Sequence, residues 1–218
     1  LSEGSPESLR EAPHTDFPRL GITQIIEHYA ALIRRMPQPP LLIGHSLGGL
    51  LVQMLLDRGL GCAGIAIAAI PPRGVIPRLS VLYRAIPMRM AWGSWKRVIY
   101  FPLRELTQAM AIQDIALLYA NHIVPAPGRI FFEAAFGIGT YVDFANDRRA
   151  PLLLIAAEND HSIRPCVVTS NYRHYNRSAA STSFKCFAGH SHWLIAEPDW
   201  EQIADYTIEW AQTQLGRF

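Results

Sequence analysis

The apolar residues of this chain follow two alternating patterns, helical spacing and short continuous runs. Between residues 22 and 36 they recur at intervals of three and four, which is typical of one face of an amphipathic helix. Residues 41–43 form a wholly apolar run, as expected of a strand that is buried on both faces of a parallel sheet. We therefore predict a helix over residues 22–36, followed by a short strand.

The same alternation continues along the chain. Helices are predicted over 47–58, 165–175 and 199–215, and strands over 62–69, 151–157 and 181–187. Short connections between alternating strands and helices are typical of right-handed crossovers in an α/β sheet. The predicted fold class is therefore α/β, a mainly parallel sheet with flanking helices, formed by residues 1–70 and 150–218.

Residues 71–149 interrupt this alternation. They are rich in aromatic residues, proline and glycine, and they show no clear strand. The pattern favours helices near 103–111 and 115–123. We interpret the segment as a helical cap inserted over one end of the sheet. Residues 1–20 are polar and are predicted to form a loop.

Composition excludes several classes of protein. Only 17% of the residues are charged, the net charge is +2 and no Lys/Arg-rich run occurs, so a nucleic-acid partner is not expected. The longest apolar stretches, near 50–56 and 62–70, are too short to span a bilayer, and residues 1–6 lack the pattern of a signal peptide. The cysteines form no C-x-x-C pair and are interpreted as reduced thiols; they are Cys62, Cys166 and Cys186. We expect a soluble cytoplasmic protein without metal or cofactor.

Ser46 stands in the segment Gly44-His45-Ser46-Leu47-Gly48, between a predicted strand and a predicted helix. In this context G-x-S-x-G is informative, because it places the serine on a sharp turn at the carboxyl edge of the sheet. Gly44 and Gly48 would let the backbone pass closely. The N–H of Leu47, at the start of the helix, could donate to an oxyanion. The alternative is a glycine-rich turn whose serine only caps the helix.

Residues 43–49, Ile-Gly-His-Ser-Leu-Gly-Gly, resemble the nucleophile elbow of the α/β-hydrolase superfamily, in particular its esterases, lipases and cofactor-free haloperoxidase-like members. The resemblance covers the chain from about residue 20 onward. It implies a catalytic triad in the chain order serine, acid, histidine. His45 would then pack beside the nucleophile rather than act as the base.

The resemblance places the acid in the loop after a later strand. The strand predicted at 151–157 leads into Glu158, Asn159 and Asp160, with Pro165 beyond them. This is similar to the family's Gly-x-x-Asp followed by an apolar residue and proline. Asp160 is the better match and Glu158 is the alternative. The interval from Asp160 to Pro165 is one residue longer than in the family pattern.

The base is expected between the last strand and the last helix, where His190 and His192 compete. The family commonly shows a histidine, an aromatic residue and then Glu-Pro, with the Glu five residues after the histidine. Counting back from Glu197 selects His192, which Trp193 follows. His190 remains the alternative because it follows Gly189 directly, as in the family's commonest form.

The chain departs from the family pattern at its beginning. Such hydrolases usually have several strands before the helix predicted at 22–36, and one of them leads into a His-Gly loop that supplies a second oxyanion donor. The sequence shows neither, so we interpret it either as a shortened form of a longer protein or as a minimal hydrolase whose second donor comes from elsewhere. An exposed sheet edge would follow. We expect it to be covered by residues 1–20 or by a homodimer.

Together these residues predict a serine hydrolase that cleaves a small to medium acyl ester or lactone through an acyl-enzyme. Ser46 would attack, His192 would be the base, Asp160 would orient that base and the Leu47 N–H would receive the oxyanion. The aromatic-rich cap suggests an apolar pocket for the substrate. A zinc site in the same loops is not favoured, because the triad already accounts for those residues. The alternative function is that of a weak or inactive relative that binds a ligand or partner.

Overall fold

The computed structural model describes residues 4–75, 93–100 and 115–216. Its four-stranded sheet is parallel throughout, in the order β1-β2-β5-β6. The strands are β1 (Leu41–His45), β2 (Ala63–Ile67), β5 (Leu152–Ala157) and β6 (Thr182–Phe187). The predicted α/β class is confirmed.

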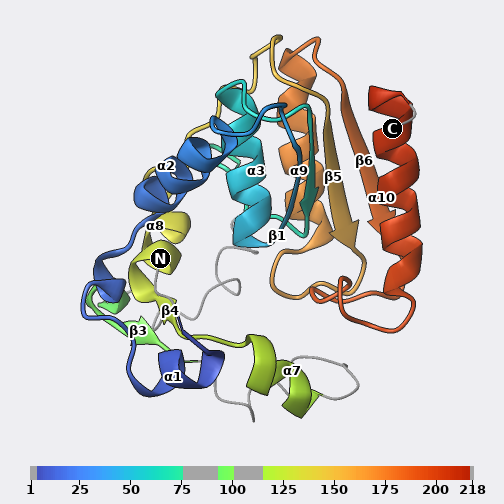
Figure 1. The fold of residues 1–218 in the computed structure, drawn as a ribbon. Coiled ribbons are helices and arrows are strands. Elements are labelled where there is room, and N and C mark those ends of the chain that lie inside the picture. The colour runs from blue at the N-terminus through green and yellow to red at the C-terminus, as the bar shows by residue number, and fades with distance from the viewer. Residues whose placement is uncertain (1–3, 76–92, 101–114, 217–218) are drawn as a thin grey trace.

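Helices cover both faces of this sheet (Figure 1). They are α3 (Leu47–Asp57), α9 (Pro165–His174) and α10 (Trp200–Leu215), while α2 (Ile22–Ile33) packs against α3. In β5, Leu154 packs with α3 and α9 while its neighbour Ile155 packs with α10. Since both faces are covered, every residue of β5 is buried, which explains its wholly apolar sequence. Within the described ranges no helix is long and apolar enough to cross a bilayer.

The remaining elements correct two predictions. Within residues 1–20, α1 (Pro6–Glu11) forms where a loop was expected; the backbone N–H of Ser8 donates to Ser5 Oγ, and proline fills the first helical position. Within residues 71–149, the short strands β3 (Val98–Ile99) and β4 (Ala126–Pro127) pair antiparallel where no strand was expected.

The rest of residues 71–149, where the structure describes it, holds two α-helices, with turns and irregular structure at 71–75 and 137–149. The helix predicted near 115–123 is confirmed as α7 (Ile115–His122), and α8 (Gly128–Phe136) was not predicted. The helix expected near 103–111 lies outside the described residues. Short 3₁₀ turns complete the fold at Phe17–Arg19, Ser94–Lys96 and Tyr175–Arg177. Figure 1 shows α1, α7 and the β3–β4 pair beyond the carboxyl edge of the parallel sheet.

β1 is an edge strand of the described sheet. Its Ile43 is 59% exposed, although it stands in register with the buried Ile65 of β2. The α1 helix packs against α7 instead of against this strand. Of the two expected coverings of this edge, α1 does not provide the first, and a homodimer stays a prediction.

Gln53 is a polar side chain buried within α3, with only 1% of its surface exposed. Its amide oxygen accepts from Asn171 Nδ2 at 2.8 Å and from the Tyr175 hydroxyl at 3.0 Å, and its amide nitrogen donates to the Gly49 carbonyl at 3.2 Å. Burial raises the pKa of Tyr175, so the phenol remains a protonated donor. These bonds tie α3 to the α9 region and so hold the helix that follows Ser46.

Candidate active site

Ser46 lies on a sharp turn between β1 and α3. Its backbone has φ 54° and ψ −114°, a conformation that costs a non-glycine residue on the order of 1–3 kcal/mol. The Ser46 side chain makes no capping hydrogen bond to α3. Its Oγ lies instead 3.2 Å from Nε2 of His192. The alternative of a serine that only caps the helix is therefore wrong.

The glycines of the elbow differ in what they permit. A Cβ on Gly44 would lie 2.2 Å from the carbonyl oxygen of Gly48, so this close approach of backbone to backbone requires glycine. A Cβ on Gly49 would lie 2.6 Å from Cβ of Ala69, so Gly49 lets α3 pack near the segment after β2. A Cβ on Gly48 would meet nothing within 4 Å. The expectation that Gly48 is also needed for close backbone passage is therefore wrong.

This difference gives a matched pair of variants. We expect Gly44→Ala to lower the free energy of unfolding by about 3 kcal/mol or more, because the new methyl group can be relieved only by moving backbone. Gly48→Ala should change it by less than about 1 kcal/mol. Urea unfolding of both variants measures this. Equal losses in the two variants would contradict the geometry of the turn.

His192 lies between Ser46 and Asp160. Its Nδ1 is 2.7 Å from Oδ2 of Asp160, a carboxylate that is 2% exposed. The other oxygen of Asp160 accepts the backbone N–H groups of Ser162 and Ile163, each at 2.7 Å. Because an ionised carboxylate can only accept, His192 carries its proton on Nδ1, and Nε2 is left to accept from the serine hydroxyl. The structure thus brings together three residues that were predicted separately.

The two alternative residues are engaged elsewhere. The carboxylate of Glu158 accepts the backbone N–H of Gly189 at 3.0 Å. Nδ1 of His190 lies 3.1 Å from Oε2 of Glu197. The geometry therefore favours Asp160 over Glu158 as the partner of the imidazole, and His192 over His190 as the partner of Ser46.

The turn that carries His192 is held by hydrogen bonds to Glu197, a buried carboxylate that is 7% exposed. Glu197 accepts the backbone N–H of Ser191 at 3.1 Å and also the Ser191 hydroxyl. The backbone N–H of Asn159 donates to the carbonyl of His190 at 2.8 Å, which ties the turn to the loop of Asp160. Sequence reasoning used Glu197 only to count residues and missed this contact.

His45 holds the same turn from the side of the elbow. Its Nε2 lies 2.7 Å from the backbone carbonyl oxygen of His192, and the two rings are 4.7 Å apart between centroids. Burial, and the nearby His192, lower the pKa of His45 to about 4. His45 is therefore uncharged at neutral pH. This contact was not predicted, since the two residues are 147 positions apart in sequence.

The lowered pKa of His45 predicts a loss of stability in acid. Between about pH 6.5 and pH 4 the unfolded chain binds a proton at His45 that the folded chain does not, so stability falls as the pH falls through this window. The loss is at most about 3 kcal/mol, from 1.36 kcal/mol for each pKa unit. We expect His45→Gln to lose less stability than the wild type between pH 7 and pH 4.5 in urea unfolding. The same loss in both proteins would contradict this assignment.

Leu47 is the first residue of α3. Its N–H belongs to the four at a helix start that have no partner within the helix, and it lies at the positive end of the helix dipole. A negatively charged oxygen bound at Ser46 could accept a hydrogen bond from this N–H, because Leu47 directly follows the serine. The arrangement can therefore move the serine proton to an imidazole and also stabilise an oxyanion beside the serine.

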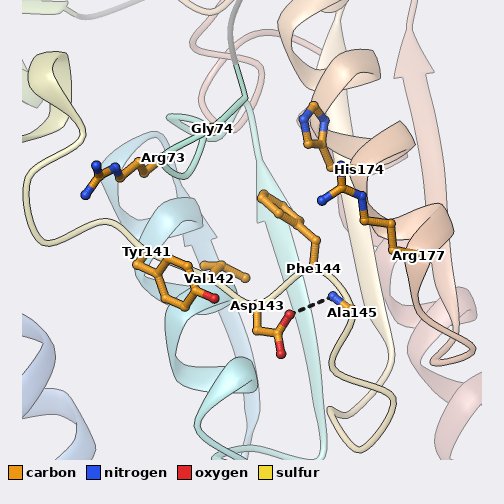
Figure 2. Close-up of a pocket in the computed structure, with 9 residues that line it drawn as sticks. All are labelled: Arg73, Gly74, Tyr141, Val142, Asp143, Phe144, Ala145, His174 and Arg177. Carbon is orange, nitrogen blue, oxygen red and sulfur yellow. Dashed lines mark hydrogen bonds between the residues drawn. The ribbon is translucent and has the colours of Figure 1, made fainter.

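A pocket of about 270 Å³ lies apart from these residues. None of Ser46, Asp160 and His192 lines it. Figure 2 shows the guanidinium groups of Arg73 and Arg177 on opposite sides of this pocket in that view. The pocket is therefore separate from the candidate active site.

This chain belongs to the alpha/beta hydrolase family, whose model matches residues 3–206. Its fold is similar to that of a monoacylglycerol lipase from Paleococcus ferrophilus, with 15% identity, a TM-score of 0.64, and 90% of this chain and 77% of that one covered. It is also similar to Est1E from Butyrivibrio proteoclasticus, with 13% identity, a TM-score of 0.56, and 91% and 73% covered.

A third similar structure is that of E-2-(acetamidomethylene)succinate hydrolase, with 15% identity, a TM-score of 0.56, and 89% and 74% of the two chains covered. No curated protein matches the chain in sequence. At these identities the similar structures bear on the fold alone. The family and the fold class are therefore established, while the reaction must be argued from the residues at the site.

Proposed function

We propose that this protein hydrolyses carboxylic esters through an acyl-enzyme formed on Ser46. The observation that carries the proposal is the unbroken line of contacts from Asp160 through His192 to Ser46, at 2.7 Å and 3.2 Å. A serine hydroxyl is a weak nucleophile near neutral pH unless a base takes its proton, and that base is most effective when a carboxylate orients it. The family to which the chain belongs supports the same reading.

In the first half of the proposed reaction, Nε2 of His192 takes the proton of Ser46 while Oγ bonds to the carbonyl carbon of the ester. The carbonyl oxygen becomes an oxyanion beside the Leu47 N–H. When the intermediate collapses, the bond to the alcohol oxygen breaks and His192 returns its proton to the leaving alcohol. Asp160 remains ionised and stabilises the imidazolium.

In the second half, water replaces the alcohol. His192 takes a proton from the water, whose oxygen attacks the acyl carbon, and the same oxyanion position is used again. Collapse of this intermediate releases the carboxylic acid and returns the proton from His192 to Ser46. No residue is consumed, so the enzyme is ready for another ester.

We further propose small to medium acyl esters or lactones as substrates, with residues 71–149 as a cap over the site. The location of α7 and the β3–β4 pair beyond the carboxyl edge of the sheet supports this. Aromatic side chains of the cap pack on one another, Trp95 on Phe132 and Phe132 on Phe136. Phe136 is still half exposed, so the proposed cap presents apolar surface of its own.

Hydrolysis of p-nitrophenyl acetate, butyrate and decanoate, with butyryl-p-nitroanilide as the amide control, tests the proposal. We expect turnover of the esters, higher kcat/KM for acetate and butyrate than for decanoate, and little turnover of the amide. Ester rates no higher than those of the heat-unfolded protein would contradict enzymatic function. That result would favour a relative that only binds a ligand.

A further inference from the structure

His192 must be fixed in two respects to act on Ser46. Its ring must face the serine, and the backbone that carries the ring must stay at the right distance from the elbow. Asp160 fixes the ring through Nδ1. A second contact acts on the backbone, since Nε2 of His45 lies 2.7 Å from the carbonyl oxygen of the same histidine.

We infer that His45 is a positioning residue, whose Nε2–H donates to the carbonyl oxygen of His192 and holds that histidine over Ser46. The inference rests on the proposed function, because the position of His192 matters only if it acts as the base. His45 is well placed for this role since it directly precedes Ser46 in the chain. One short segment therefore carries both the nucleophile and the anchor of its base.

The direction of the hydrogen bond follows from its partner. A backbone carbonyl oxygen can only accept, so His45 must carry a proton on Nε2. The ring also packs at a tilt against two others, at 4.7 Å from the His192 ring and 5.5 Å from the Trp193 ring between centroids. His45 is thus restrained both by the contact at Nε2 and by the two rings it packs against.

The charge state of His45 suits the reaction as well. Because its pKa is lowered to about 4, His45 is uncharged when His192 takes the serine proton. Aspartate or glutamate at this position would offer only acceptors to the carbonyl oxygen, and lysine would place a second positive charge beside the imidazolium. An uncharged side chain with an N–H group at this reach can donate to the carbonyl oxygen and adds no positive charge beside the imidazolium.

A pair of substitutions separates the hydrogen bond from the bulk of the ring. Glutamine keeps an N–H donor at similar reach, whereas leucine keeps apolar volume without a donor. For His45→Leu we expect kcat on p-nitrophenyl butyrate to fall roughly 10- to 100-fold, because a small misplacement of a catalytic group has effects of this size. KM should change by less than about twofold, since substrate binding is not affected. His45→Gln should keep kcat within about threefold of the wild type.

His28→Leu is the matched control, since His28 is an exposed histidine on α2. Thermal unfolding checks that every variant is folded at the assay temperature. A His45→Leu protein with the wild-type kcat would overturn the inference, and so would a His45→Gln protein that is as slow as His45→Leu. The second result would mean that the ring's shape, and not its hydrogen bond, is what matters.

The hydrogen bond from His45 to His192 can also be tested in the absence of substrate. Long-range ¹H–¹⁵N NMR of the wild type at pH 7 should show His45 protonated on Nε2 and bare on Nδ1. The opposite tautomer would overturn the inference even in an active protein. Wild-type protein that is inactive on every ester would contradict the proposed function instead, and the NMR measurement would still decide whether His45 donates to His192.

Discussion

Replacing Ser46 with alanine should lower kcat for ester hydrolysis by roughly 10⁴- to 10⁶-fold, because no other oxygen can take its place in the acyl-enzyme. The fold should be unaffected, since the Ser46 hydroxyl caps no helix and points to His192. The free energy of unfolding should therefore stay within about 1 kcal/mol of the wild type. Steady-state kinetics on p-nitrophenyl butyrate, with urea unfolding of the same preparation, measures both.

Ser170→Ala is the control for this variant. Ser170 lies on α9, and the contact described for it uses its backbone carbonyl, which accepts from His174 and is unchanged by the substitution. We expect wild-type kinetics from Ser170→Ala. If Ser46→Ala retained a tenth or more of the wild-type kcat, hydrolysis would not proceed through Ser46.

Replacing Asp160 with asparagine should lower kcat by roughly 10⁴-fold through the tautomer of His192. An asparagine carbonyl oxygen can still accept the N–H groups of Ser162 and Ile163, which Oδ1 of Asp160 accepts in the wild type. Its NH₂ group would then face Nδ1 of His192, donor against donor. The imidazole proton would move to Nε2, and Nε2 could no longer accept from Ser46.

Glu158→Gln is the matched control for Asp160→Asn. Glu158 is the other carboxylate of the same loop, and its side chain accepts from Gly189 and not from His192. We expect its kcat to stay within about threefold of the wild type, as for a residue outside the line of contacts to the serine. A larger loss in Glu158→Gln than in Asp160→Asn would mean that the acid has been assigned to the wrong residue.

The parallel core could be predicted from the sequence because its signal is local. Strands β2 and β5 are continuous apolar runs, as strands buried on both faces must be, and each begins and ends within two residues of its predicted position. Ser46 was predicted from its motif between a strand and a helix, and Asp160 and His192 from the resemblance to α/β-hydrolases, in which the acid and the base each follow a later strand. The carboxyl ends of parallel strands meet at one edge of the sheet, so residues distant in sequence come together there.

The features that were missed depend on contacts between distant residues or on very short elements. β3 and β4 have two residues each, too few to show an alternating pattern. α1 has six residues, and Arg10 within it donates to the carbonyls of Tyr119 and Ile123 at the end of α7, so its stability depends on a distant helix. The contact between His45 and His192 has no local signal of any kind.

The glycines around Ser46 show a further limit of prediction from a sequence motif. A motif match marks Gly44 and Gly48 alike, although only the first is required by backbone contact. The difference depends on which way each missing side chain would point. That direction is set by the sharp turn at Ser46 and is seen only in three dimensions.

Labelling with a fluorophosphonate probe tests most directly whether Ser46 is an activated nucleophile. The probe reacts with a serine whose proton a neighbouring base removes, and it leaves a stable phosphonyl adduct. We expect mass spectrometry to find one adduct per chain, on the peptide that contains Ser46, and to find slow labelling in Asp160→Asn. Folded wild-type protein that stays unlabelled, or that is labelled on a different serine, would contradict the central claim.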